Sequence, residues 1–505
     1  MTIHIKRPPV ARDSALYADL AKAVGGDVAR LVVEEAALRP YAEDFTSVVD
    51  KGMPQIVVRA SSVEEVQEVL RVANRHRVPV TPWSAGYGLG TSLAPEGGIL
   101  LELKGMNRIL EINPDEMYVL VEPGVTYADL TPLLVEKDLV ISVPDAPATV
   151  SVLANHLNFG IGAYQMQHGM GPELVLGLEV VLPTGELVRT GSAAREGSSW
   201  FARFAYNPIP DLTGIFLGSM GTLGVCTKLA IRVFPRPEKV HYAKVGFGDV
   251  GTAARAIQAV SRRGLVDRVA GFSWFFTPRA TAILAGRVTG QPLDRTTLDA
   301  MRAEVAEVPE VYFFLGIHGS AGTVEARRAE MEAAIGREFG GTFLEMTPDD
   351  HEKYHNVANG LTQVQSERAI LGAKGKYQGA YGTYVTYTPI ANWEGLYEAW
   401  AEIAGRYGHP LAMNTKLFGH GRYSSFRFIL SYFDQNDEKD RQRITDMCSA
   451  LEAEALDRGA ASGGTTSATL RTLASYELYR RIKDCLDPNG IMHPSMGDWQ
   501  PGRNN

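Results

Sequence analysis

A glycine-rich loop between two apolar runs carries the most informative chemistry in this sequence. Residues 82–90 read Pro-Trp-Ser-Ala-Gly-Tyr-Gly-Leu-Gly, with apolar runs at 78–81 and 99–103 on either side. A strand, a glycine turn and a second strand can form a nest of converging backbone N–H groups that binds an anion such as a diphosphate. The loop has neither the P-loop motif nor the strand–GxGxxG–helix unit of the usual dinucleotide fold. Taken alone, it also fits a plain glycine turn.

A second group of residues that could take part in catalysis lies at 420–427, which reads His-Gly-Arg-Tyr-Ser-Ser-Phe-Arg. If a strand begins here, alternation puts Tyr423, Ser425 and Arg427 on one face. An arginine on that face could bind a carboxylate bidentately or stabilise a phenolate. His420 could act as a general base near neutral pH. The alternative is an exposed loop whose polar groups are satisfied by water.

The elements that must position these residues are short strands alternating with helices. From Pro54 to about Pro235 the pattern predicts strands and helices in turn, including a helix that begins at Ser62 with Glu65 as its capping partner. A longer helix is predicted over 13–39. Pro235-Arg-Pro237 marks a domain boundary, and two strand–helix–strand units follow it. Residues 476–486 read as an amphipathic helix.

Composition limits the classes of function. The chain has 505 residues and a formal net charge of −8, without a basic cluster, so neither nucleic acid nor an anionic membrane is an expected partner. No apolar run reaches the length of a membrane span, and no secretory signal is seen. Cys226, Cys448 and Cys485 lie far apart, which favours a reduced, cytoplasmic location over a disulfide framework.

Five segments carry a resemblance to a known family: 63–70 with the glycine loop, 106–109 with 121–126, 144–145 with 151–162, 176–185 with 218–224, and 486–491. In this order they resemble the vanillyl-alcohol oxidase / p-cresol methylhydroxylase superfamily of FAD enzymes. The resemblance covers nearly the whole chain and is strongest over 54–237 and 476–494. Some phrases are more similar to the D-lactate/glycolate dehydrogenase branch. The family implies an α+β fold in which a bipartite FAD-binding domain of two α+β subdomains, 1–237 and 460–505, is interrupted by an α+β cap or substrate domain, 238–459.

The resemblance also implies which residues contact FAD. Carried over position by position, they are Trp83, Ser84, Ala85, Gly86, Tyr87, Gly88, Leu89, Pro144, Asp145, Thr149, Ser151, Asn155, Gly160, Gly162, Val225 and His493. Many relatives tether FAD through a histidine, but the two matching positions here are Arg427 and Tyr87. We therefore expect non-covalent FAD, unless a shift places His420 in that role.

Asp145 matches an aspartate that phenol oxidases carry near the flavin N5, as a base or a stabiliser of charge. His420, Arg427 and Tyr423 are the other expected catalytic residues. Hydroxyacid relatives bind a metal through a histidine pair and a Glu-His-Gly segment. Here the second histidine is Arg427, and residues 461–467 read Ala-Ser-Gly-Gly-Thr-Thr-Ser, so no metal site is expected.

The expected function is an FAD-dependent oxidase or dehydrogenase that moves a hydride from a small hydroxylated substrate to flavin. A para-substituted phenol or benzylic alcohol is the first choice, and a D-2-hydroxyacid, clamped by Arg427 or Arg422, is the second. A third alternative uses FAD as a non-redox scaffold, as in ether-lipid synthase relatives, or without catalysis. The electron acceptor would be O2 or a redox carrier, and the family implies a homodimer.

Overall fold

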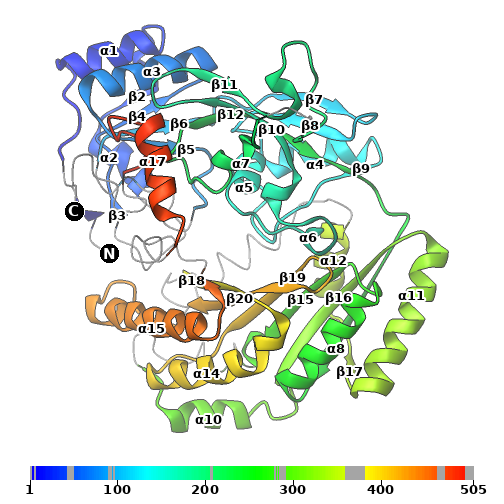
Figure 1. Ribbon diagram of the computed structural model, residues 1–505. Coiled ribbons are helices and arrows are strands. Elements are labelled where there is room, and N and C mark those ends of the chain that lie inside the picture. The colour runs from blue at the N-terminus through cyan, green and yellow to red at the C-terminus, as the bar shows by residue number, and fades with distance from the viewer. Residues whose placement is uncertain are drawn as a thin grey trace.

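The computed structural model describes residues 3–4, 7–42, 51–88, 94, 97–204, 209–277, 280, 283, 292–358, 382–430, 432–462 and 473–494. Sheets of four, five and eight strands organise them, with two short strand pairs besides. In Figure 1 the two smaller sheets, in blue and in cyan to green, lie above the largest one, in green to orange. This mixture of helices and strands confirms the predicted α+β class. No described helix has the length and apolar character needed to cross a membrane.

A four-stranded sheet near the N-terminus positions the glycine loop. Its last three strands in spatial order are parallel, and β5 lies at the edge. Strands of parallel sheets are buried on both faces, which explains their nearly continuous apolar sequence. The loop leaves the end of β5, so this sheet fixes where the loop begins. The order is β2 (Leu31–Val32), β4 (Ile56–Arg59), β6 (Ile99–Glu102) and β5 (Val80–Trp83).

Helices α1 (Ala15–Ala23) and α3 (Val63–His76) pack with this sheet in one apolar core. Helix α3 begins as predicted, because the Ser62 hydroxyl oxygen accepts the N–H of Glu65 at 3.2 Å. The predicted helix over 13–39 is wrong in extent. Gly25 and Gly26 follow α1 with φ of 68° and 84°, a backbone conformation that ends a helix.

A five-stranded antiparallel sheet forms the second part of the N-terminal half. Helices α4 (Tyr127–Val135) and α5 (Val152–Leu157) contribute to its core. The predicted hairpin between β10 and β11 is present, with Gly185 at φ 85° in its turn. The spatial order is β11 (Leu187–Arg189), β10 (Val175–Val181), β12 (Val225–Arg232), β8 (Tyr118–Val121) and β7 (Ile109–Asn113).

The C-terminal segment returns to this N-terminal half. Helix α17 (Tyr476–Leu486), red in Figure 1, packs beside the blue and green parts. The Lys483 ammonium is buried, pairs with Asp487, and donates to the carbonyl oxygens of Thr222 at 2.6 Å and Met492 at 3.0 Å. Met492 also forms a parallel bridge with Val80. These contacts give the part that is expected to bind FAD, called the FAD-binding part below, the bipartite character that the family resemblance implies.

The eight-stranded sheet belongs to the second half of the chain, the cap. Every pair of neighbours in it is antiparallel. Its order is not sequential, so strands distant in the sequence become neighbours. The order is β17 (Thr342–Leu344), β14 (Lys239–Phe247), β16 (Val311–Gly319), β15 (Arg268–Ser273), β19 (Met413–Phe418), β20 (Tyr423–Leu430), β18 (Gly382–Thr388) and β21 (Ala461–Ser462).

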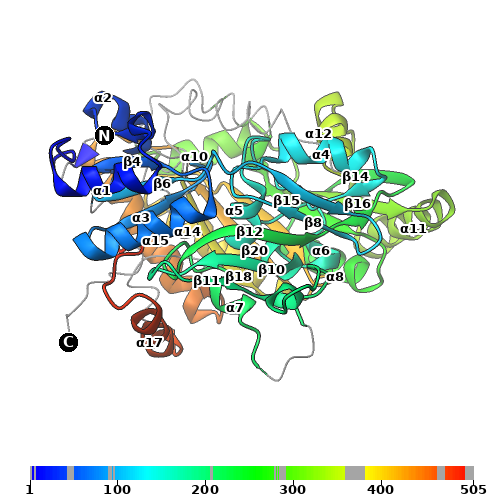
Figure 2. The same ribbon diagram turned by 90° about the horizontal axis from the view of Figure 1, so that it is seen from above.

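Helices cover one face of the cap sheet. They are α8 (Val250–Arg262), α11 (Ala321–Ala333), α14 (Trp393–Arg406) and α15 (Glu438–Asp457), and they share a large apolar core with the sheet. Figure 1 shows these helices on the side away from the FAD-binding part. Seen from above, α1 and α3 lie at one end of the molecule and α11 at the other (Figure 2). The second face of the cap sheet therefore meets the FAD-binding part.

Candidate functional site

The glycine loop after β5 contacts the segment that follows residue 144. The hydroxyl oxygens of Tyr87 and Thr149 lie 2.6 Å apart. Gly86 adopts φ 75°, and a Cβ there would overlap the indole of Trp83. Only glycine takes this conformation without strain. Two of the segments expected at FAD thus lie together. Ser84, Ala85 and Gly88 are half-buried along the same loop, and Leu89 lies outside the described residues.

Two close approaches of the backbone shape the next segments. Pro144 pairs with Gly162 in an antiparallel bridge. A Cβ on Gly162 would overlap the Ser142 hydroxyl, and one on Gly160 would overlap Asn155. Both glycines are therefore required by packing within the protein, whatever else they contact.

Ser151 and Asn155 have partners within the fold. The Ser151 hydroxyl donates to the Pro123 carbonyl oxygen at 2.6 Å and accepts the Ala154 N–H at 3.1 Å, so it caps helix α5. The Asn155 side-chain oxygen accepts from the Tyr127 hydroxyl at 2.9 Å. Ser151 and Asn155 would therefore contact a cofactor through their backbone or through side-chain atoms that these hydrogen bonds do not use.

Val225 and His493 lie near the start of the glycine loop. Val225 is buried at the start of β12 and packs in the N-terminal core. The His493 N–H donates to the Val80 carbonyl oxygen at 2.8 Å, and its Nδ1 lies 2.8 Å from the Met220 carbonyl oxygen. The structure therefore joins two of the predicted FAD segments to this region: His493 to the start of β5, and Thr149 to the loop that follows it.

The described residues leave buried polar atoms that fit a polar ligand. Both amide atoms of the fully buried Gln165 and the Asn158 side-chain oxygen have no hydrogen-bond partner among the described residues. Gln165 begins the short helix α6 (Gln165–His168), which contacts β15 and β19 of the cap. Buried donors and acceptors normally find a partner, and the ring edge of a flavin offers both kinds. The residues present thus fit FAD.

Asp145 joins the FAD-binding part to the cap through two ion pairs. Its Oδ1 lies 3.1 Å from Nη2 of Arg268 on β15, and its Oδ2 lies 2.5 Å from Nζ of Lys416 on β19. Arg268 and Lys416 are almost completely buried, whereas 20% of the Asp145 side chain is exposed. Each carboxylate oxygen therefore already binds a cation.

Arg427 adds a third cation to the same face of the sheet. Across the strands, Lys416 lies opposite Ser425 and Asn414 opposite Arg427. Because alternate residues share a face, this register confirms that Tyr423, Ser425 and Arg427 lie on one face. Arg427 Nε, with Nε and Nη1 of Arg268, is buried without a hydrogen-bond partner among the described residues. The guanidinium of Arg268 also lies over the ring of Tyr354, 5.0 Å from the ring centroid.

A second network fixes Asp267, which precedes Arg268. Its carboxylate accepts two hydrogen bonds from Arg327, at 2.7 and 2.9 Å, and one from the His318 N–H at 2.7 Å. Gln167 on α6 donates to it at 2.5 Å. Burial lowers the pKa of His318 to about 4, so that imidazole is neutral at pH 7. The network places Arg268 by holding the start of β15.

Two expected catalytic residues lie at the end of the β19–β20 hairpin. His420 is exposed, has φ 54°, and donates its N–H to the Met166 carbonyl oxygen at 3.1 Å. Tyr423 is half-buried and stacks on Phe418, with ring centroids 5.0 Å apart. The structure thus brings Arg427 onto the strand face that carries Lys416 and leaves His420 at the surface.

Sequence reasoning missed Arg268 and Lys416. Each is a charged residue within an apolar strand, and that pattern could have marked both.

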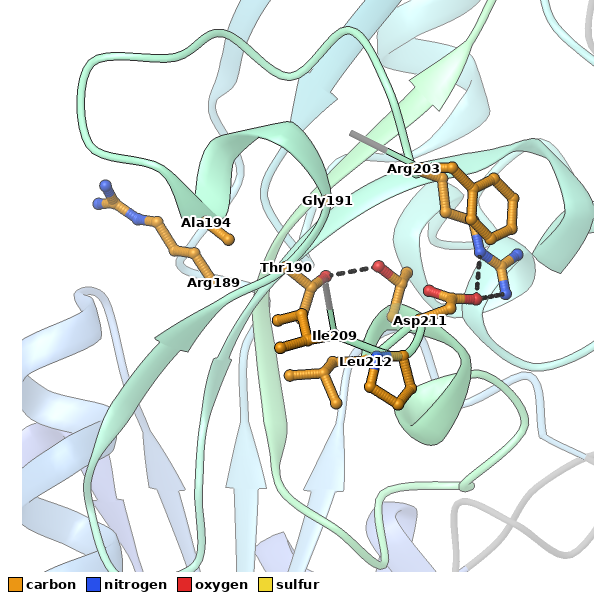
Figure 3. A pocket seen from close by; sticks show the side chains of 11 residues that line it. Arg189, Thr190, Gly191, Ala194, Arg203, Ile209, Asp211 and Leu212 are labelled. Atoms are coloured by element: carbon orange, nitrogen blue, oxygen red, sulfur yellow. Dashed lines mark hydrogen bonds and ion pairs between the residues drawn. The ribbon is translucent and has the colours of Figure 1, made fainter. Parts of the chain in front are cut away.

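A separate hollow lies on the FAD-binding part, beside β11 and helix α7 (Thr213–Phe216). Figure 3 shows Arg203 facing Asp211 across it, with an N–O distance of 2.6 Å. The hydroxyl oxygens of Thr190 and Thr213 lie 2.9 Å apart there. None of the predicted site residues lines this hollow, so we assign the chemistry to the cluster around Asp145.

Two known protein families match most of the chain. A family described as "FAD binding domain" matches residues 54–191, and one described as "FAD linked oxidases, C-terminal domain" matches 236–469 and 470–496. The glycolate oxidase subunit GlcD of Bacillus subtilis is 29% identical over 212 residues, 42% of this chain and 43% of that protein. The 4-cresol dehydrogenase flavoprotein subunit of Pseudomonas putida is 31% identical over 236 residues, 46% of this chain and 44% of that protein.

Both alignments span less than half of the relative's length. A solved structure of p-cresol methylhydroxylase with substrate bound is similar over 97% of both chains, with a TM-score of 0.85 and 20% sequence identity. At this identity the structural likeness speaks for the fold.

Proposed function

Because this chain belongs to the FAD-linked oxidases, whose C-terminal domain family matches more than half of it, we propose that it oxidises a small hydroxylated compound, with a para-substituted phenol or benzylic alcohol as the first choice. FAD is its cofactor, as the resemblance implied, and the chain is an FAD-linked oxidoreductase. The observation that carries the substrate proposal is the group of three cations on the cap face at Asp145: the buried Arg268 and Lys416, which pair with Asp145, and the half-buried Arg427 beside them. Such a group stabilises negative charge on a substrate oxygen.

The residues of the chain have distinct tasks in this proposal. FAD supplies the hydride acceptor. The loop 84–88 and the segments at 144–162 hold and orient it. Arg268 and Arg427 donate hydrogen bonds to the substrate oxygen as it loses its proton. Asp145 keeps Arg268 and Lys416 in place. Asp145 thus takes part in the mechanism as the carboxylate that positions these two cations.

A D-2-hydroxyacid is the second candidate. The unpartnered N–H groups of Arg268 and Arg427 among the described residues suit a carboxylate as well as a phenolate. The 29% identity to a glycolate oxidase subunit supports the same choice.

The test is anaerobic flavin spectroscopy of the purified protein with a 4-alkylphenol and, separately, a D-2-hydroxyacid. Bleaching by the phenol supports the first candidate, and bleaching by the acid supports the second. Flavin that stays oxidised with both, yet is reduced by dithionite, would contradict the proposed substrate classes. Acid precipitation should release FAD into the supernatant, because we propose a non-covalent cofactor; yellow precipitate would contradict that.

We also propose the domain division 1–237, 238–459 and 460–505, with one adjustment. Strand β21 (Ala461–Ser462) pairs with β18 in the cap sheet. The second boundary is therefore better placed after Ser462.

A further inference from the structure

Lys416 lies on the cap face that meets the FAD-binding part, and only 5% of its side chain is exposed. Its cross-strand neighbours are Ala270 on β15 and Ser425 on β20. Both side chains end close to the backbone, so neither reaches the ammonium group at the end of the lysine. The Ser425 hydroxyl is itself buried without a hydrogen-bond partner among the described residues. The polar partner of Lys416 is Asp145, which comes from the FAD-binding part.

Three charged groups face Lys416 from the elements packed against it. Asp145 comes from the FAD-binding part, Arg268 from β15 and Arg427 from β20. Burial, then the two arginines, favour the neutral amine, whereas Asp145 favours the ammonium form. The balance lowers the pKa of Lys416 to about 8. This amine can therefore gain and lose a proton close to neutral pH.

We propose that Lys416, and not Asp145, receives the hydroxyl proton of the substrate. The inference rests on the proposed function, and it follows from what each neighbour can accept. Guanidinium groups have no acceptor site, which excludes Arg268 and Arg427. A proton on Asp145 would leave the buried guanidinium of Arg268 without its counter-charge. Within this cluster, the neutral amine of Lys416 is the group left with a lone pair to take the proton.

The proposed step conserves atoms and electrons. Oxidation of an alcohol or a 4-alkylphenol breaks one C–H and one O–H bond. The hydride leaves carbon with its electron pair and passes to FAD. The proton leaves oxygen and forms a new N–H bond on Lys416 Nζ, so the amine becomes an ammonium next to Asp145. Arg268 and Arg427 stabilise the negative charge on the oxygen.

The first test needs no substrate. The melting temperature of the FAD-loaded wild type is compared with that of Lys416→Met between about pH 7 and about pH 10. A lysine in the unfolded chain has a pKa of about 10.4, so the unfolded state binds more protons above about pH 8. The wild type should gain stability relative to the variant as pH rises through this window, by about 2 °C. Lys239→Met, an exposed lysine of the same sheet, is the control and should show a constant difference. A constant difference for Lys416→Met as well would overturn the proposal.

The second test measures anaerobic flavin reduction by whichever substrate bleaches the wild type. The wild-type rate should rise with pH around a midpoint near 8, because the neutral amine is the acceptor. Lys416→Met should lower the rate about 100-fold and remove this dependence, and Lys416→Arg, which keeps the charge, should do the same. A variant with the wild-type profile would overturn the proposal. If no phenol or hydroxyacid reduces the wild-type flavin, the proposed function fails, and the melting comparison still decides whether Lys416 exists as a neutral amine.

Discussion

At the scale of single residues, the site is defined by a carboxylate that is shared between two cations. Asp145 contacts Arg268 and Lys416 at once, and it comes from the FAD-binding part while both partners come from the cap. A buried ion pair contributes little net stability, because desolvation offsets the attraction. Its value here is geometric: it sets how the polar face of the cap lies against the cofactor segments.

Replacing Asp145 by asparagine should slow flavin reduction by substrate about 100-fold or more. The amide removes the charge that holds Lys416 and Arg268, and so the proton acceptor and the oxygen-binding arginine lose their positions. Stopped-flow measurement of the reductive half-reaction checks this. Asp350→Asn is the matched control, because Asp350 pairs at 3.2 Å with Lys244, a lysine on the same sheet. This variant should leave the rate unchanged. Equal rates for Asp145→Asn and the control would remove Asp145 from the mechanism.

At the scale of elements, the start of β15 is the joint: it connects the cap to the FAD-binding part and positions Arg268 in the site. Asp267 receives hydrogen bonds from α11, from β16 and from α6 of the FAD-binding part. The next residue, Arg268, reaches Asp145. Since Asp267 is buried, its charge needs these partners, and together they hold the joint in one arrangement.

Arg327→Met should lower the free energy of unfolding by about 2–3 kcal/mol. It removes two hydrogen bonds from a buried carboxylate, and urea denaturation measures the change. Arg328→Met is the control on the same helix, because Arg328 is 41% exposed and pairs with Glu332 at the surface; its effect should stay within about 0.5 kcal/mol. Similar losses in both variants would show that the Asp267 network does not stabilise the joint.

At the scale of the whole molecule, buried neutral histidines lie in both halves. Burial lowers the pKa of His156 and His318 to about 4 and that of His409 to about 3. His156 belongs to the FAD-binding part, and the other two to the cap. Each one favours the folded state only while it is neutral, so acid acts on the two halves together.

The free energy of unfolding should therefore fall as pH drops from about 6.5 to about 4. In that window histidines of the unfolded chain bind protons that the folded protein excludes. Urea denaturation at several pH values measures the slope, and His156→Gln should reduce it. His420→Gln, at an exposed position, is the control and should leave the slope as it is. An unchanged slope in His156→Gln would contradict the assignment.

Much of this architecture could be predicted from periodicity and from motifs. The Ser62 cap, the β10–β11 hairpin and the face shared by Tyr423, Ser425 and Arg427 depend on local spacing, and the structure has all three. The pairing of Asp145 with Arg268 and Lys416 could not be read in this way, because it depends on which strands of the cap sheet become neighbours. Sheet order is set by packing between distant segments, and no local pattern records it. The helix predicted over 13–39 failed for a local reason, the two glycines after Ala23.

The return of the C-terminal segment has a consequence for how the protein is made. Val80 belongs to a sheet whose strands are synthesised early. The edge strand of that sheet nevertheless pairs with Met492, near the C-terminus, and the buried ion pair of Lys483 and Asp487 stabilises this pairing. The strands of the cap all emerge before these residues do. During synthesis the cap can thus assemble while the nucleotide-binding half still lacks its last strand contact, so the half begun first is finished last. A nascent chain stalled before residue 476 would hold every described strand of the cap, whereas β5 would still lack its bridge to Met492.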